Sequence, residues 1–145
     1  MKRLILVLAL LVCFSWISTA SVEVTLLEPT QYVRTKGKPN AYENTFPGVI
    51  GEAILIVTNG DGDGKKRISR AVIWVNGEEV LGTSDFNQKL GELTVQIGIQ
   101  QDSTIRVELR SKPGSYLTVE VNRAMEVDAG KSIGPGSFAE DDELP

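Results

Sequence analysis

A hydrophobic pattern of period two runs through most of the chain, and it constrains the fold more than any other feature. Apolar and polar residues alternate in residues 22–26, 93–97, 105–109 and 117–121. Such segments form strands that bury one face and expose the other. No segment has a sustained i, i+3, i+4 pattern of the kind a helix needs. The pattern therefore predicts an all-β fold.

Two further runs, residues 53–57 and 71–75, are apolar at every position. Both are short and bounded by turn residues, so we expect central strands covered on both faces rather than buried helices. Asn76-Gly77 follows the second run and favours a type I′ hairpin, because both central residues of that turn have positive φ. Seven to eight strands at roughly ten-residue spacing predict an antiparallel β-sandwich, Ig-like or jelly-roll-like.

The first twenty residues have the order of a secretory signal peptide. Lys2 and Arg3 precede an apolar run at 4–14, and small residues close the segment at 18–20. The run is short for a bilayer crossing, which needs about 20 residues, although a retained anchor helix is the alternative. Cleavage after residue 20 predicts an exported protein (periplasmic, extracellular or cell-surface) with no membrane span and without Cys13.

The folded body is predicted to span residues 21–123, followed by a disordered tail at 124–145. In the tail the alternation fades, glycine and proline accumulate, and six acidic residues stand against one lysine. A segment that buries so little apolar surface cannot offset the entropy lost on ordering. The tail thus carries a formal charge of −5 and the body about −1, and Lys2 and Arg3 bring the whole chain to −4.

The composition excludes several chemistries. The sequence has no His and one Cys, which excludes Ser-His-Asp and Cys-His catalysis, imidazole ligands, an intrachain disulfide and a Cys-based zinc site. The charges, 15 Lys and Arg against 19 Asp and Glu, are too mixed for a nucleic-acid-binding protein. The acidic residues fall on polar strand faces or in turns, where a solvated charge is ordinary. We therefore predict no enzyme activity, no cofactor and no metal.

Residues 59–64, Asn-Gly-Asp-Gly-Asp-Gly, match the start of a calcium-binding loop. Such a loop has oxygen ligands at its first, third and fifth positions and glycine at the sixth. However, Lys66 replaces the expected apolar residue, and Arg70 replaces the final acid. We favour a Gly- and Asp-rich turn between two strands, and a calcium-dependent adhesion module is kept as a third hypothesis.

Residues 29–48 form the longest stretch of the body without clear periodicity. Long loops on a rigid sandwich often carry binding function, which makes Tyr32, Arg34 and Tyr42 the candidate ligand-binding residues. The alternative, which we favour, is a structural cover loop whose tyrosines cap the edge of the sandwich. Trp74 lies inside an apolar run, so we expect it to pack in the core.

Several short motifs occur in order along the body. They are Tyr32-x-Arg34-x-x-Gly37-x-Pro39, Asn59-Gly60, Ala71 to Val75 with Asn76-Gly77, Asp85-Phe86-Asn87-Gln88, and Val107-Glu108-Leu109-x-Ser111-x-Pro113-Gly114-Ser115-x-Leu117-Thr118-Val119. In this series the chain resembles a β-sandwich module that recurs in secreted and cell-surface proteins of environmental bacteria. The resemblance covers residues 30–122. It implies an exported β-sandwich module and transfers no catalytic or ligand residues.

These observations predict a non-catalytic exported module that binds protein or polysaccharide at the cell surface or in the periplasm. The alternative is a structural or assembly subunit that pairs through an exposed sheet edge. Nucleic acid is not an expected partner, and the oligomeric state stays open.

Overall fold

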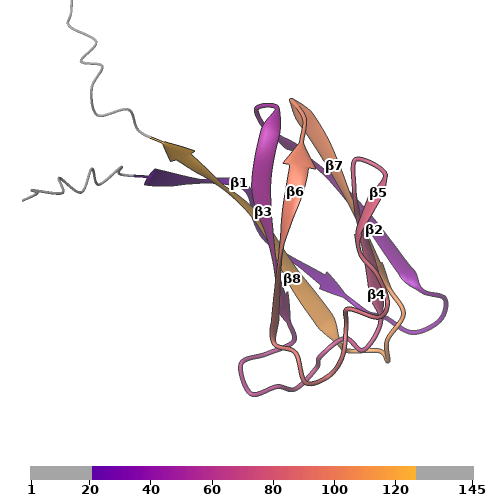
Figure 1. The fold of residues 1–145 in the computed structure, drawn as a ribbon. Coiled ribbons are helices and arrows are strands. Elements are labelled where there is room, and N and C mark those ends of the chain that lie inside the picture. The colour runs from indigo at the N-terminus through magenta and orange to yellow at the C-terminus, as the bar shows by residue number, and fades with distance from the viewer. Residues whose placement is uncertain (1–20, 127–145) are drawn as a thin grey trace, which may run out of the picture.

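The computed structural model describes residues 21–126 as a β-sandwich of two antiparallel four-stranded sheets (Figure 1). In chain order the strands are β1 (Ser21–Val33), β2 (Asn40–Pro47), β3 (Gly51–Asn59), β4 (Ala71–Val75), β5 (Glu78–Leu81), β6 (Glu92–Ile99), β7 (Asp102–Leu109) and β8 (Tyr116–Glu126). The first sheet has the order β1-β8-β3-β6 and the second has β2-β7-β4-β5. The predicted all-β antiparallel sandwich is confirmed. Within residues 21–126, no helix could span a membrane.

Side chains from both sheets fill one core between them. Alternate residues of the strands face inward, and the largest fully buried side chains include Phe46, Leu55, Ile68, Ile73, Ile105, Leu109 and Leu117. Full burial of an aliphatic or aromatic side chain of this size is worth about 1.5–3 kcal/mol. The polar residues between them face solvent, which is why the alternation was a reliable signal.

The prediction that residues 53–57 would be covered on both faces is wrong. Leu55 and Val57 are fully buried, but Ile54 between them is 37% exposed. β3 lies inside its sheet, between β8 and β6, so its edges are paired while its outer face meets solvent. An unbroken apolar run can therefore also be a strand buried on one face with aliphatic residues on the other.

The stretch at 29–48 is mostly strand rather than loop, so that expectation is also corrected. β1 continues to Val33, and β2 pairs with β7 along its whole length, from Asn40 opposite Leu109 to Pro47 opposite Asp102. Only residues 34–39 connect the two strands. The inward positions of β2 include a polar Asn44, which hides the alternation in the sequence. Pairing with β7 decides the structure here.

The beginning of β1 and the end of β8 form a two-stranded arm, residues 21–24 with 123–126. β3 pairs with β8 only up to Asn122, whereas β1 pairs with β8 as far as Ser21 opposite Glu126. The arm leaves the sandwich with both ends of the described chain side by side (Figure 1). β8 thus runs three residues past the predicted end of the body at 123. The predicted signal peptide and the rest of the predicted tail lie outside the described residues.

The outer edge of β1 is interrupted rather than straight. Its pairing with β8 shifts register between Thr25 and Leu27 and again between Leu27 and Thr30, and Pro29 lies in the second irregular stretch. Bulges and proline are devices that discourage a strand edge from pairing with another chain. Assembly through a sheet edge stays a prediction.

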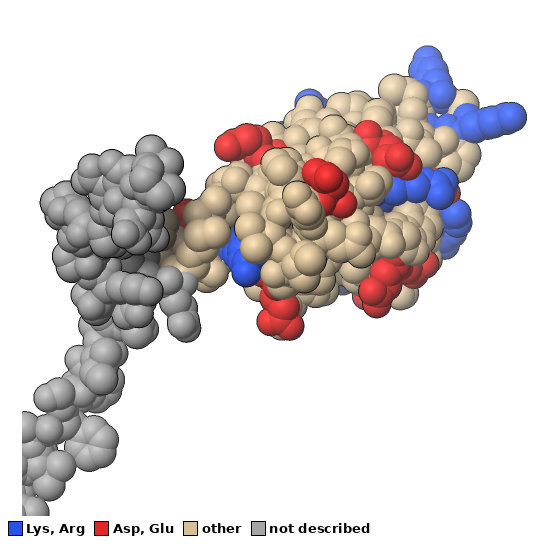
Figure 2. Space-filling model, turned by 90° about the horizontal axis from the view of Figure 1, so that it is seen from above, with Lys and Arg blue, Asp and Glu red and all other residues tan. Residues whose placement is uncertain are grey.

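The connections between strands divide between two ends of the sandwich. Residues 34–39, 60–70, 82–91 and 110–115 lie at one end, which we call the distal end, since backbone hydrogen bonds join Gly114 to Arg34, Asn59 to Gly91 and Arg110 to Arg70. Residues 48–50, 76–77 and 100–101 lie at the opposite end, beside the arm, which we call the arm end. Figure 2 looks onto the arm end and shows Asp and Glu side chains spread over it.

Candidate functional site

Tyr32 and Tyr42, two of the candidate ligand-binding residues, lie against each other. Their ring centroids are 5.3 Å apart with the rings tilted by 45°. Tyr32 is only 3% exposed, and its hydroxyl donates a hydrogen bond to Asn44 Oδ1 at 2.9 Å. The Tyr42 hydroxyl donates to the Val33 carbonyl at 2.5 Å. Both phenol groups are thus engaged within the protein.

Arg34, the third candidate, closes the connection between β1 and β2. It is 7% exposed, and its guanidinium donates to Asn40 Oδ1 at 2.8 Å, to the Gly37 carbonyl at 2.8 Å and to the Thr35 carbonyl. The structure brings the three candidates together, with Tyr32 on β1, Tyr42 on β2 and Arg34 in the short connection between these strands. Their role in binding a ligand stays a prediction, and their burial leaves little surface for it.

The buried phenol of Tyr32 predicts a loss of stability at high pH. Burial raises the pKa of Tyr32 above its ordinary value of 10.0, because desolvation disfavours the phenolate. This contribution is fully present below about pH 10 and is lost as the pH rises through the higher folded pKa. Tyr32→Phe should therefore flatten the fall in the free energy of unfolding as the pH rises above about 10, measured with urea. An equally steep fall in the variant would contradict this assignment.

Trp74 is on the outside of the sandwich, which corrects the expectation that it packs in the core. Ile73 is fully buried and Val75 is 3% exposed, so the residue between them faces outward, where it is half-buried. The strand register places Trp74 opposite Arg106 of β7 and Glu79 of β5. Because Ile73 and Val75 are apolar and flank Trp74 in a strand, the alternation of the sequence could have indicated that Trp74 faces outward.

A row of acidic, basic and aromatic side chains crosses the outer face of the second sheet beside Trp74. It consists of Glu43 (β2), Arg106 (β7), Trp74 (β4) and Glu79 (β5), paired across successive strands. The Arg106 guanidinium carbon lies 4.9 Å from the centroid of the Trp74 ring, a cation–π contact. Arg106 also reaches Glu108 at 3.5 Å, and Arg110 holds the same carboxylate at 2.6 Å. The arginine is thus oriented beside the ring while its side chain stays 49% exposed.

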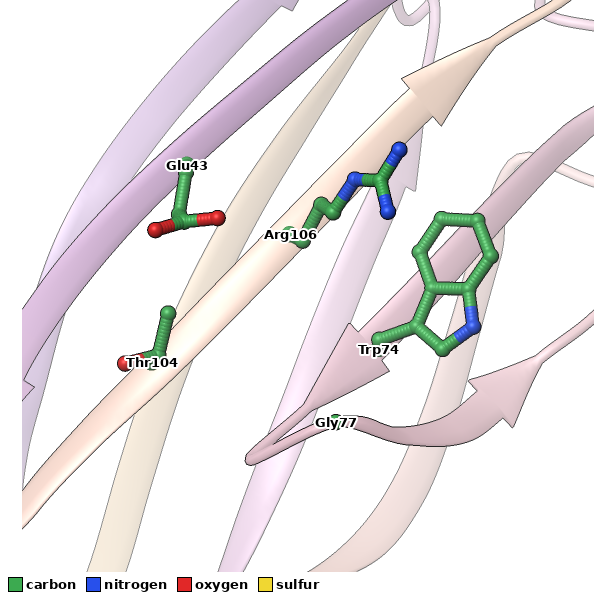
Figure 3. A pocket seen from close by; sticks show the side chains of 5 residues that line it. All are labelled: Glu43, Trp74, Gly77, Thr104 and Arg106. Atoms are coloured by element: carbon green, nitrogen blue, oxygen red, sulfur yellow. The ribbon is translucent and has the colours of Figure 1, made fainter.

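A shallow hollow of about 210 Å³ lies over this row, and we call it the Trp74 hollow. It is lined by Glu43, Trp74, Gly77, Thr104 and Arg106 (Figure 3). Gly77 belongs to the β4–β5 hairpin turn, where φ is 50° at Asn76 and 82° at Gly77, as the type I′ prediction requires. Because Gly77 has no side chain, the turn does not fill this side of the hollow.

The Trp74 hollow combines an apolar ring with a guanidinium, a carboxylate and a hydroxyl. One face of a sugar ring presents C–H groups and its rim presents hydroxyls, so this set can contact both. Only one carboxylate lines the hollow, whereas glycoside hydrolysis ordinarily uses a pair. The arrangement offers an apolar surface and polar groups that can hold a ligand.

Residues 59–64, the proposed calcium-binding loop, form a turn closed by hydrogen bonds within the protein. Asn59 is fully buried and its side-chain oxygen accepts the Ile68 N–H at 2.7 Å. Asp61 Oδ1 accepts the Lys65 N–H at 2.6 Å, and the Asp61 carbonyl accepts the Gly64 N–H, so this segment forms a closed turn. Among residues 21–126, no group of three or more His, Cys, Asp or Glu side chains could hold a metal ion.

Comparisons with known proteins give structural similarity at low sequence identity. No family model and no curated protein sequence matches the chain. A native family 35 carbohydrate-binding module from Clostridium thermocellum is 14% identical, covering 73% of this chain and 99% of that one, with a TM-score of 0.44. A family 35 module from Paenibacillus barcinonensis is 17% identical, covering 73% and 99%, with a TM-score of 0.40. A third, from an environmental isolate, is 12% identical, covering 70% and 92%, with a TM-score of 0.39.

Proposed function

We propose that this chain is a non-catalytic polysaccharide-binding module, and that the Trp74 hollow holds the sugar. The observation that carries the proposal is the half-buried Trp74 ring on the outer face of the second sheet, beside Arg106 and Glu43. Tryptophan offers a large apolar surface with a polar edge, which suits contact surfaces that are partly wet. The solved structures above are carbohydrate-binding modules, but the proposal rests on the Trp74 hollow.

Each residue of the hollow has a separate role in this proposal. Trp74 stacks against the C–H face of one sugar unit, and Arg106 donates hydrogen bonds to hydroxyl or carboxylate oxygens beside it. Glu43 accepts from a hydroxyl, and Thr104 can both donate and accept. Export to the periplasm, the cell surface or the medium is part of the same proposal.

Removing the Trp74 ring should abolish most of the binding. We expect Trp74→Ala to weaken binding to a retained polysaccharide at least about tenfold, or about 1.4 kcal/mol, because the stacking surface is lost. Affinity electrophoresis of the full chain through gels containing xylan, galactomannan, dextran or polygalacturonate measures this effect. Ile50→Ala is the control, since Ile50 is an apolar side chain that is 77% exposed at the arm end and does not line the hollow.

Tryptophan fluorescence gives an independent reading of contact at the hollow. The sequence has two tryptophans, so Trp16→Phe makes Trp74 the only one. We expect the emission of that variant to shift when the retained polysaccharide is added. Retention of Trp74→Ala equal to that of the unchanged protein, or the absence of retention by every polysaccharide, would overturn the proposal.

A further inference from the structure

Positive charge gathers at the distal end, although the described chain is nearly neutral as a whole. The four connections of the distal end carry ten Lys and Arg against three Asp, a formal charge of +7. The rest of residues 21–126 carries two Arg against eleven Asp and Glu. Figure 2 shows Asp and Glu side chains scattered over the face seen from above, and most of the visible Lys and Arg at the margin furthest from the arm. The fold thus gathers positive charge from four separate stretches of sequence.

Most of these bases have no carboxylate partner. Eight of the ten are exposed, and besides Arg110 they are Lys36, Lys38, Lys65, Lys66, Arg70, Lys89 and Lys112. The ion pairs within residues 21–126 are those of Glu108 with Arg106 and Arg110, so none of the other seven is paired. Like charges that share one surface repel each other unless an anion lies between them. The distal end therefore has strong positive potential available to a ligand.

The loops that present these charges are held in place by the backbone. Residues 34–39 join 110–115 through two hydrogen bonds, Arg34 N–H to the Ser115 carbonyl and Gly114 N–H to the Arg34 carbonyl. Residues 60–67 join β8 through Gly60 N–H to the Tyr116 carbonyl and Tyr116 N–H to the Lys66 carbonyl. The positions of the exposed bases are therefore fixed at the level of the backbone.

Arg67 joins the 82–91 connection to the other distal connections. Its guanidinium donates to the Gln88 and Lys89 carbonyls at 3.1 and 2.9 Å, and it packs closely on Gly91, where an added Cβ would lie 2.9 Å from Arg67 Nη2. A hollow of about 340 Å³ opens beside it, lined by Gly64, Lys65, Lys66, Arg67, Gln88 and Lys112. Arg67 is used in structure, whereas the three lysines around it remain free.

Lys66 has an unfavourable backbone conformation. Its φ is 56°, in the left-handed region that costs a residue with a side chain about 1–2 kcal/mol. Glycine or asparagine would adopt this conformation more easily. Strained residues are found where the surroundings or a function require them. A lysine at this position is consistent with a use for its charge.

We propose that the distal end is an electrostatic binding surface for a polysaccharide bearing carboxylate or sulfate groups. This deepens the proposed function and depends on it for the class of ligand. Arg106 on the outer face of β7 and Arg110, the first residue after β7, lead along the chain from the Trp74 hollow towards Lys112, so one acidic chain can contact both sites. The bases are spread over four loops, which suits an extended polyanion better than a single small anion.

Two other polyanions fit the surface less well. The aromatic side chain within the distal connections, Phe86, is 3% exposed and offers no platform on which a nucleic acid base could stack. Two large apolar residues near this end are exposed, Val33 at 37% and Leu90 at 38%. Val33 ends β1 and Leu90 lies in the 82–91 connection. They form little surface for insertion into a lipid bilayer.

Neutralising three distal lysines tests the proposal. We expect Lys65→Gln/Lys66→Gln/Lys112→Gln to weaken binding to polygalacturonate or dextran sulfate at least about tenfold at low salt. The reason is that each lysine pairs with an anionic group of the polymer and releases a counterion from it. The matched control is Thr94→Glu/Gln100→Glu/Gln101→Glu, which lowers the net charge equally on exposed positions away from the distal end. We expect the control to change binding less than about twofold.

The outcomes separate the two proposals. If Trp74→Ala removes binding to neutral polysaccharides while salt-sensitive binding to polygalacturonate persists, both stand. If Trp74→Ala changes nothing but the distal variant loses polygalacturonate, only the Trp74 hollow fails. Equal losses in the distal variant and its control, or tighter retention of single-stranded DNA or phosphatidylglycerol vesicles than of either polyanionic polysaccharide, would overturn the distal surface.

Lys66→Asn distinguishes binding from a structural role. Asparagine tolerates positive φ, so we expect the thermal midpoint to stay equal or rise while polyanion binding weakens. A fall in the midpoint with unchanged binding would show that Lys66 serves the fold instead.

Discussion

Replacing Asn59 with alanine is expected to lower the free energy of unfolding by about 3–5 kcal/mol, among the largest effects for a polar residue in this chain. Asn59 is fully buried at the end of β3. The two hydrogens of its side-chain nitrogen are shared among the carbonyls of Ile68, Asn87 and Leu90 at 3.0, 3.2 and 3.1 Å, and its oxygen accepts the Ile68 N–H at 2.7 Å. Alanine would leave these backbone groups without partners in the interior, where an unsatisfied group costs about 1–3 kcal/mol.

Urea unfolding followed by far-ultraviolet circular dichroism measures this loss. Thr58→Ala is the control, because Thr58 precedes Asn59 on the same strand and its side chain is exposed. Asn59→Asp keeps the acceptor but loses the amide donor and buries a charge, so it should be destabilising as well. A loss below about 1 kcal/mol in Asn59→Ala would show that the three carbonyls find other partners.

The alternation of period two was sufficient to predict the two-sheet fold, because it reports burial directly. The same alternation also indicates which face of the strand Trp74 and Asn59 occupy. Trp74 lies between two inward residues, and Asn59 continues the inward series of Leu55 and Val57. The apolar character of residue 74 and the turn-forming character of residue 59 suggested the opposite placements. Residue type was a weaker guide than position within the strand.

Other features depend on contacts between distant segments, and no local pattern could predict them. β2 forms because β7 pairs with all of it, although its own sequence is rich in polar residues. The distal charge arises because four connections meet at one end of the sandwich, whereas the sequence gives only a nearly neutral sum. Tyr32 and Arg34 are held inside by partners on β2, which the sequence does not place beside them. Topology, rather than composition, determines both surfaces.

Gly60→Ala should be at least as damaging as the loss of Asn59, and for a different reason. The φ of Gly60 is 74°, and an added Cβ would lie 2.4 Å from the Lys65 carbonyl oxygen and 2.8 Å from the Arg67 backbone nitrogen. Both contacts are with backbone atoms, so the loop must move to admit the methyl group. We expect a loss of about 4 kcal/mol or more, combining this clash with the cost of a left-handed alanine.

The same loop contains its own control at Gly62. An added Cβ there meets nothing within 4 Å and the φ is not positive, so Gly62→Ala should be neutral or stabilise by up to about 1 kcal/mol. Soluble yield and urea midpoints of the two variants measure the contrast, and equal stabilities would contradict it. Gly60 also ties this loop to β8, so surviving Gly60→Ala protein should bind polyanionic polysaccharides less well while Gly62→Ala binds normally. The two glycines thus test whether the backbone of residues 60–67 positions the lysines of the distal end.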